Sequence, residues 1–311
     1  MPWRYHPPQP SAHPQVSHSH GPLLLLVMIL SSLISFADDS PESPASRVII
    51  QPAAKAATQT QPIQDNSFLI EEAYNQELHV VQHISTFTRS WSTHEWLYTF
   101  TQEWPVGGLT HQLSYTLSYL NSGGSPGIGD VALNYRYQPV GSGETRLAFA
   151  PRITLLLASG NPRLGRGFGG TGFQTNLPLS WAINRKLVTH WNAGVTFVPH
   201  ARNESGAGAA VNGYNLGHSV VWLAHPRFNV LLETLWTGSQ SVVAPGRTQR
   251  SHDLLLSPGI RWAHNFPSGL QIVPGIGVPI GVGPSAGEKG VFLYLSFEHP
   301  FRAFGGQRNV E

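Results

Sequence analysis

From Leu78 onward the sequence alternates between apolar and polar residues with a period of two. In residues 111–119 the polar positions Gln112, Ser114, Thr116 and Ser118 interleave with apolar ones at Leu113, Tyr115, Leu117 and Tyr119. The same alternation recurs at 130–137, 173–177 and 291–297. A period of two places successive side chains on opposite faces of a β-strand. No stretch after residue 78 sustains a helical period, so this part of the chain is predicted to be all-β.

About twelve such segments can be counted, each roughly ten residues long. An even number of strands of this length is typical of a closed antiparallel transmembrane β-barrel, because a lipid environment leaves no partner for an open sheet edge. We therefore predict an all-β fold, a closed antiparallel transmembrane β-barrel of about twelve strands over residues 78–301, followed by a C-terminal tail at 302–311. The predicted strands are 79–91, 95–105, 110–121, 128–139, 145–158, 171–183, 187–199, 213–224, 228–238, 252–264, 270–281 and 290–301.

The composition supports a surface that does not face water. Charged residues make up 12% of the 311 residues, and aromatic residues 10%, whereas a typical soluble domain is about 25% charged. The formal net charge of +2 and the lack of a basic stripe argue against a nucleic-acid partner. The absence of cysteine excludes disulfides and thiolate metal sites. The alternative at this stage is a soluble β-sandwich whose core holds the aromatic residues.

The predicted connections sort by side if the N-terminus is periplasmic. The turns on that side are short, at 106–109, 140–144, 184–186, 225–227 and 265–269. Apart from the tight connection 92–94, the opposite loops are longer, at 121–127, 159–170, 200–212, 239–251 and 282–289. Aromatic residues fall near both strand ends and predict two interfacial girdles: Trp91, Trp96, Tyr119 and Trp236 on the extracellular side, and Trp104, Tyr137, Trp181, Trp222 and Trp262 on the periplasmic side.

The region before the strands divides into three parts. Residues 1–37 read as a signal peptide, because the apolar run Leu23–Ala37 is about five residues shorter than a comfortable transmembrane helix, which is the alternative. Residues 38–65 are rich in Pro, Ala, Gln, Thr and Ser and are predicted to be a disordered periplasmic linker. Residues 66–77 form either a short helix that docks at the periplasmic mouth or a lead-in to the first strand.

The inward strand faces carry the candidate functional residues. We expect lumen and selectivity roles for Glu103, Asp130, Arg136, Arg152, Glu233 and Arg261. Structural pairing between neighbouring strands is the alternative for each of them. The sequence leaves open whether the lumen is a small pore or is plugged by side chains and the N-terminal segment.

No catalytic residues, metal site or cofactor are expected. Ser180 and His190 lie on consecutive strands, but nothing in the sequence marks them as a pair. The glycine-rich stretch at 165–172 has no helix behind it, as a dinucleotide site would require.

The stretch Gly127-Ile128-Gly129-Asp130-Val131-Ala132-Leu133-Asn134-Tyr135-Arg136-Tyr137 resembles the Gly-Asp strand motif of outer-membrane proteins of the MetA pathway of phenol degradation. Residues 150–152, 158–160, 257–261 and 67–77 are similar to the same family, although Ala158-Ser159-Gly160 departs from its usual Pro-Thr-Gly. The resemblance implies a channel or transporter in the outer membrane of a Gram-negative bacterium. Its permeant would be a small molecule, hydrophobic or aromatic in character.

The partners that follow from this interpretation are membrane lipid and a small-molecule permeant, and the oligomeric state stays open. The alternative function is a non-conducting surface or structural protein that binds partners through its extracellular loops.

Overall fold

The computed structural model describes Ile63, residues 67–142 and residues 145–300, and every structural statement below concerns these residues. The predicted signal peptide, the predicted C-terminal tail and the predicted linker apart from Ile63 lie outside them. No helix within the described residues is long and apolar enough to cross a membrane.

The described chain forms one antiparallel sheet of seventeen strands and two short 3-10 turns, η1 (Pro162–Leu164) and η2 (Gly283–Ser285). The strands are β1 (Val80–Ser90), β2 (Trp96–Pro105), β3 (His111–Asn121), β4 (Gly127–Ile128), β5 (Val131–Tyr137), β6 (Leu147–Phe149), β7 (Arg152–Leu157), β8 (Gly172–Asn176), β9 (Leu179–Asn184), β10 (Leu187–Arg202), β11 (Gly208–His225), β12 (Phe228–Ala244), β13 (Arg247–Trp262), β14 (His264–Asn265), β15 (Gln271–Gly277), β16 (Ile280–Gly281) and β17 (Gly290–Pro300).

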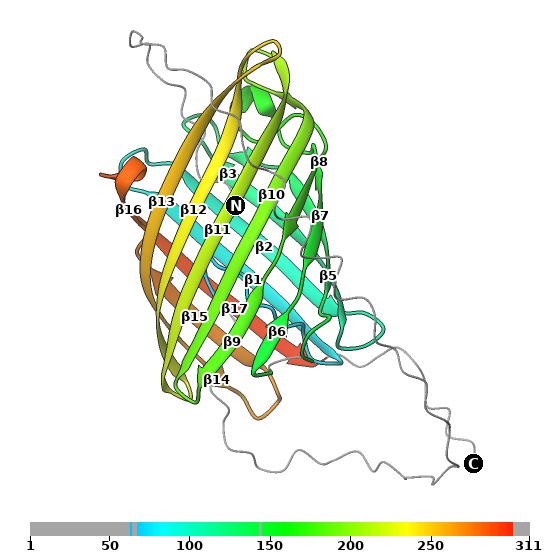
Figure 1. Cartoon of the computed structure of the whole chain (residues 1–311), viewed down its shortest axis with the longest axis vertical. Helices are drawn as coiled ribbons and strands as arrows, with labels where there is room; N and C mark the ends of the chain where they lie inside the picture. The colour runs from blue at the N-terminus through cyan, green and yellow to red at the C-terminus, as the bar shows by residue number, and fades with distance from the viewer. Residues whose placement is uncertain (1–62, 64–66, 143–144, 301–311) are drawn as a thin grey trace, which may run out of the picture. The chain divides into compact units, whose positions relative to one another are not determined.

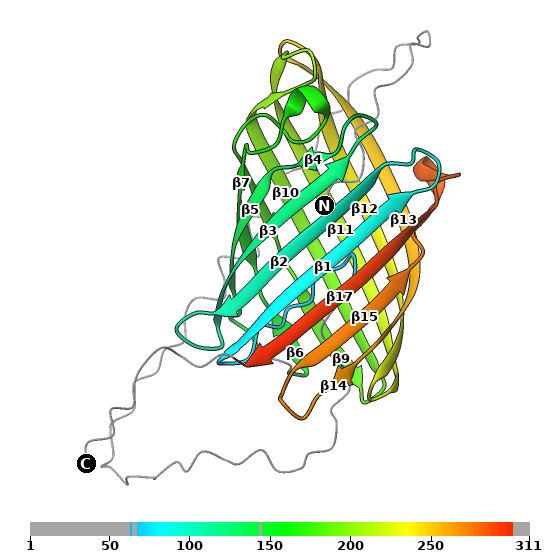
Figure 2. The same cartoon turned by 180° about the vertical axis from the view of Figure 1, so that it is seen from behind.

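Five pairs of consecutive strands each act as one interrupted crossing, so the wall has twelve crossings; the pairs are β4–β5, β6–β7, β8–β9, β13–β14 and β15–β16. The first and last strands close it: β1 pairs with β17 along its whole length, from Val80 opposite Pro300 to Ser90 opposite Gly290. Figures 1 and 2 show this closed wall from two opposite sides. The predicted fold class is therefore confirmed, and the β-sandwich alternative is wrong.

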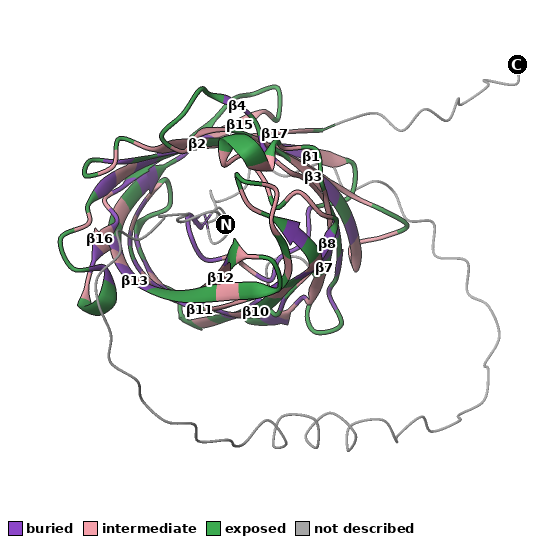
Figure 3. Ribbon diagram, turned by 90° about the horizontal axis from the view of Figure 1, so that it is seen from above, coloured by how far each residue is buried: buried purple, intermediate pink, exposed green. Residues whose placement is uncertain are grey.

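The barrel wall is apolar outside and polar inside. On β3, Leu113, Leu117 and Tyr119 are exposed, whereas Gln112 and Ser114 between them are buried. Exposed large apolar side chains recur around the wall, whose closed ring Figure 3 shows from above. The inward face instead carries buried Gln, Asn, Ser, Arg and Glu. A soluble β-protein has the opposite arrangement, with apolar residues inside. The arrangement here follows from the period of two, because lipid contacts one face of every strand.

The two ends of the barrel differ. At the end we call the turn end, short connections at 106–110, 185–186, 226–227 and 266–270 join the strands. The opposite end, the loop end, carries the long connections 158–171 and 282–289. Exposed Trp181, Trp222 and Trp262 lie near the turn end, and exposed Trp91 and Tyr119 lie near the loop end, as expected for two interfacial girdles.

Two of the predicted long loops are wrong. The loops predicted at 200–212 and 239–251 are largely continued strand, so their connections shrink to 203–207 and 245–246. Pairing of β12 with β13 continues, through a register shift after Val242, as far as Ala244 opposite Arg247. Gly246, with φ of 67°, then turns the chain in a left-handed conformation that suits glycine. The prediction failed because it limited each strand to the thickness of a bilayer.

Candidate functional site in the barrel lumen

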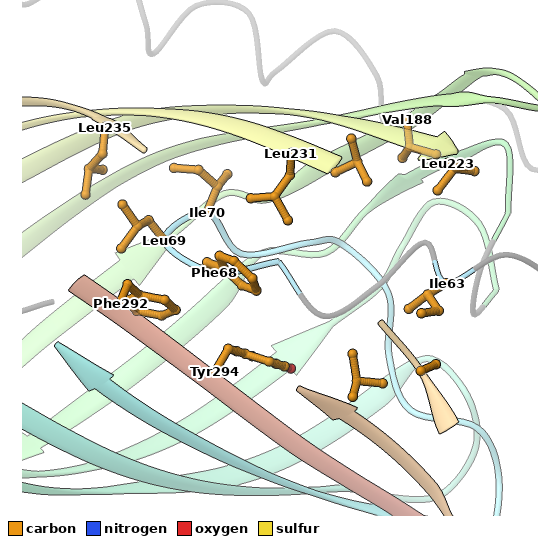
Figure 4. Packing of buried hydrophobic residues seen from close by; sticks show 13 residues of the cluster. Ile63, Phe68, Leu69, Ile70, Val188, Leu223, Leu231, Leu235, Phe292 and Tyr294 are labelled. Atoms are coloured by element: carbon orange, nitrogen blue, oxygen red, sulfur yellow. The ribbon is translucent and has the colours of Figure 1, made fainter. Parts of the chain in front are cut away.

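Residues 67–77, here called the luminal segment, run through the inside of the barrel rather than docking at its mouth (Figures 2 and 4). The segment contains bends and no helix, so the lead-in alternative describes it and the helix does not. It crosses the lumen from β12, at Phe68–Ile70, to β3, at Gln76. Eight of its eleven residues are buried, so little water reaches the lumen at this level.

An irregular backbone buried in a barrel must find hydrogen-bond partners outside any sheet. Lumen side chains supply them here. Ser180 Oγ accepts from the N–H of Ala73 at 2.8 Å, and Gln138 Oε1 accepts from that of Asn75 at 3.0 Å. Gln112 Oε1 accepts from the N–H of Gln76 at 2.8 Å. The polar inner wall is therefore matched, residue by residue, to the backbone of the segment.

Glu233, on β12, binds the first part of the luminal segment. Its carboxylate accepts hydrogen bonds from three successive N–H groups, those of Phe68 (3.1 Å), Leu69 (2.7 Å) and Ile70 (3.4 Å). Glu233 itself is fully buried. A carboxylate that accepts from several backbone N–H groups forms charge-assisted bonds that are stronger than neutral ones. Glu233 therefore fixes the position at which the segment enters the middle of the lumen.

Phe68 provides the apolar anchor of the segment. Its ring lies 5.3 Å from the ring centroid of Phe292 and 5.4 Å from that of Tyr294, and it is 9% exposed (Figure 4). The wall makes room for the ring with glycine. A Cβ added at Gly275 would lie 2.4 Å from Phe68 Cζ, and one at Gly259 would lie 2.8 Å from Cε2. The barrel is therefore hollowed at the place where this ring enters it.

Glu71 forms the charged centre of the site. Its Oε2 accepts from Arg152 Nε at 2.9 Å and from Asn176 Nδ2 at 2.7 Å, and its Oε1 lies 3.3 Å from Arg136 Nη1. Arg136 also donates to Asn75 Oδ1 at 2.9 Å and to the carbonyl of Tyr74 at 2.7 Å. Burial by itself raises the pKa of the Glu71 carboxyl, but the guanidinium groups of Arg152 and Arg136 outweigh it and lower that pKa below its ordinary value.

The structure brings most of the predicted lumen residues to this segment. Arg136, Arg152 and Glu233 bind it directly, and Glu103 lies 3.6 Å from Arg136. Arg261 donates to the carbonyl of Ile63 at 3.2 Å, where the chain enters the barrel.

Asp130 has a different environment, near the loop end. Its carboxylate accepts from the N–H of Gly160 at 2.9 Å and from that of Phe168 at 2.7 Å. It therefore fastens the connection 158–171 to the wall, which gives the Gly-Asp motif a structural role.

Toward the loop end the lumen wall is lined by small polar side chains that are only half-buried. Thr86 bonds Thr99 at 2.6 Å, and Thr101 bonds Thr116 at 2.8 Å, between neighbouring strands. On the facing strands Gln174 donates to Thr196 at 3.0 Å. A hydroxyl-lined surface with partial exposure is suited to water and polar solutes. The lumen thus consists of a packed level at the luminal segment and, toward the loop end, a half whose wall carries half-buried hydroxyl and amide side chains.

Ser180 and His190, which the sequence did not mark as a pair, do form one. Ser180 Oγ lies 2.8 Å from His190 Nδ1, and both residues are fully buried. The ring of Tyr74 packs edge-on against His190, and the Ser180 hydroxyl already accepts from Ala73. The pair holds the luminal segment and has no accessible surface for a substrate. Among the described residues no group of three or more His, Asp or Glu could hold a metal ion.

Sequence reasoning missed the residues that receive the segment without carrying charge. Gly259, Gly275 and Gly277 surround Phe68, and a Cβ at Gly217 would lie 2.4 Å from Ile70 Cδ1. Glycine within a strand is a signal of close backbone approach, and three of these glycines fall at inward positions of β13 and β15. That signal was present, but the partner of the hollow lies almost two hundred residues earlier in the chain.

No protein-family model matches the sequence, and no curated protein matches it either. Among solved structures, the barrel resembles an outer-membrane channel from Pseudomonas putida F1, with 13% identity, a TM-score of 0.53, and coverage of 74% of this chain and 98% of that one. The NanC porin has 13% identity, a TM-score of 0.49 and coverage of 69% and 98%. The KdgM porin has 9% identity, a TM-score of 0.44 and coverage of 71% and 99%.

At these identities the likeness shows the fold alone, and this chain shares that fold with the channel from Pseudomonas putida F1. That fold is a closed outer-membrane β-barrel. Together with the apolar outer wall, it confirms the predicted fold class and the predicted location in the outer membrane.

Proposed function

We propose that this protein is a passive outer-membrane channel for small molecules, in which the luminal segment closes the barrel at rest. The observation that carries the proposal is the pairing of a half-buried, hydroxyl-lined half of the lumen with a level at which residues 67–77 are packed. The segment has no strand pairing with the wall, so it can leave without opening the barrel. A barrel with a purely structural role would not need a separate segment that crosses its lumen.

The permeant class that fits the predicted resemblance is a small molecule with apolar or aromatic character. Within the described lumen, Phe292 and Tyr294 on β17 present aromatic surface beside the Phe68 hollow. These rings would contact a solute only after Phe68 leaves. The motif resemblance at Gly127–Tyr137 supports the same permeant class.

A second function is favoured by the packing itself. If the luminal segment never leaves, the protein is a non-conducting surface or structural protein. The long strands β10, β11, β12 and β13, of 16 to 18 residues, would then present partner-binding hairpins at the loop end.

Liposome swelling with the refolded full-length protein separates the two functions. We expect slow permeation of a small neutral sugar by the natural sequence and clearly faster permeation by Phe68→Ala, because the substitution removes the anchor of the segment. Phe173→Ala is the matched control, since Phe173 is 55% exposed on the outer face. No permeation by either the natural protein or Phe68→Ala, with the barrel folded, would exclude the channel and leave the second function.

A further inference from the structure

The Glu71 carboxylate lies in a cradle that the barrel wall builds. Arg152, Asn176 and Arg136 come from three different strands, β7, β8 and β5, and all three donate to this one carboxylate. Guanidinium groups bind carboxylates with favourable geometry and strength. The Glu71 side chain is therefore bound as an anionic ligand would be, although it belongs to the chain itself.

Two of the three donors, Arg152 and Asn176, are held in place by the wall as well as by Glu71, whereas the hydrogen bonds of Arg136 go to the luminal segment. Arg152 Nη1 donates to Asn134 Oδ1 at 2.8 Å and to Thr154 Oγ1 at 3.0 Å, and Asn176 Nδ2 lies 3.2 Å from Asn192 Oδ1. These partners are strand residues of the barrel. Arg152 and Asn176 would therefore stay in position if Glu71 withdrew, leaving an organised site for another anion.

The cradle is also partly accessible to solvent. The side chains of Glu71 and Arg152 are 20% and 21% exposed, whereas residues 67–70 of the same segment are buried. Gln174 and Thr196, which line the lumen next to the cradle toward the loop end, are half-buried. A small solute that enters from the loop end meets the Glu71–Arg152 pair before it meets the packed part of the segment.

Charge balance indicates the class of anion. Arg136 and Arg152 are paired with the carboxylates of Glu71 and Glu103, and Glu72 also acts on the charge of Arg136, so the two guanidinium groups already face at least as many carboxylates. A monocarboxylate that replaces Glu71 restores that balance, whereas a phosphate dianion would add a negative charge beside Glu103. Uncompensated charge in such an enclosed site is costly.

We propose that the cradle of Arg136, Arg152 and Asn176 is a binding site for small carboxylate solutes, and that Glu71 occupies it as a built-in competitor. A solute carboxylate displaces that of Glu71 and thereby weakens the attachment of the luminal segment. This proposal rests on the proposed channel function, because binding of the permeant would then weaken the closure of the channel by the luminal segment. The binding step itself needs no conduction.

Binding is tested with acetate as the probe and the full-length protein refolded in detergent. Saturation-transfer NMR of the acetate methyl group gives the dissociation constant. We expect Glu71→Gln to bind acetate at least tenfold more tightly than the natural protein, because the competitor loses its charge. Glu77→Gln, which makes the same charge change at the exposed end of the luminal segment, should bind like the natural protein, and Glu71→Gln combined with Arg152→Gln should lose the gain. Equal affinity of Glu71→Gln and the natural protein would overturn the proposal.

A second measurement serves if Glu71→Gln fails to fold. The chain has no cysteine, so a single Ala73→Cys reports on the segment through its rate of reaction with a polar maleimide. We expect acetate to accelerate this labelling severalfold over chloride at equal ionic strength. Identical rates in the two salts, or the same acceleration in Arg152→Gln, would contradict the site. Because both readouts are independent of permeation, their failure is distinguishable from failure of the channel.

Discussion

Removal of the Phe68 ring should release the luminal segment from the lumen. Phe68 is 9% exposed, so nearly all of its side chain is withdrawn from water against Phe292, Tyr294 and the glycine hollow. Burial of a phenylalanine side chain stabilises by roughly 1.5–3 kcal/mol. The hollow in the wall is empty of the ring in the undocked state of both proteins, so a cavity term adds little to the change in docking free energy. Phe68→Ala should therefore shift the docking equilibrium by about 2 kcal/mol, a factor of about 30.

The labelling rate of Ala73→Cys measures that shift. Residue 73 is 0% exposed, and its N–H is bound to Ser180, so a maleimide reaches a cysteine there only when the segment leaves. Phe68→Ala should raise the rate about 30-fold if redocking is fast compared with labelling. Phe173→Ala, an outward truncation of the same kind, should leave the rate unchanged.

Gly275→Ala tests the same contact from the other side. The added Cβ would lie 2.4 Å from Phe68 Cζ, which forces the ring to move, so this variant should also speed labelling. Once Phe68 is alanine, the Cβ at residue 275 meets only Arg261 Cβ, at 3.2 Å, and should have a much smaller further effect. Additive effects of the two substitutions would refute the reasoning that the hollow exists to receive Phe68.

Three further outcomes are expected. Docking holds the pKa of Glu71 below its ordinary value of 4.5, so this carboxyl favours the docked segment above that pH, and its contribution is lost as pH falls through the lowered pKa. The amides of residues 68–76 should lose protection from hydrogen exchange over the same pH range. Glu71→Gln should abolish that part of the pH dependence. Glu233→Gln leaves one amide oxygen where two carboxyl oxygens accept from three N–H groups, and a buried donor left without a partner costs roughly 1–3 kcal/mol. Labelling of Ala73→Cys should then be about 5- to 150-fold faster. An unchanged rate would show that Glu233 does not hold the segment. Asp130→Ala removes the acceptor of the Gly160 and Phe168 N–H groups, so limited trypsin digestion at Arg163 should become faster. The unheated variant should still migrate in electrophoresis as a folded barrel. Loss of the barrel itself would contradict a role confined to the connection 158–171.

The wall of the barrel was predictable because its causes are local in sequence. Alternation at residues 111–119 fixes which face of β3 meets lipid, and short turns fix antiparallel order. Closure then follows from the requirement that no strand edge remain unpaired in lipid. The two overpredicted loops at the ends of β10–β13 mark the limit of this reasoning, since strand length beyond the membrane depends on pairing and not on bilayer thickness.

The interior was predictable in its residues but not in its connections. Inward parity identified Arg136, Arg152 and Glu233, yet their partners are Glu71 and the backbone of residues 68–74. No local sequence pattern in residues 67–77 indicates that this irregular segment binds to barrel strands that come later in the chain. Its polarity pattern is neither helical nor strand-like, because its contacts alternate between a carboxylate, a glycine hollow and amide side chains.

The central claim is that the luminal segment closes the channel, and fixing that segment in place tests it most directly. Ala73 packs with Ala148 and Ala150 of the wall, and the chain has no other cysteine to interfere. Cysteines at 73 and 150, joined through a short dithiol linker, would tie the segment down, and planar-bilayer conductance is recorded before and after the linker is cleaved in the same membrane. The account predicts a closed barrel while the linker is intact and the appearance of channel openings after cleavage. The same conductance in both states would show that residues 67–77 do not close this channel.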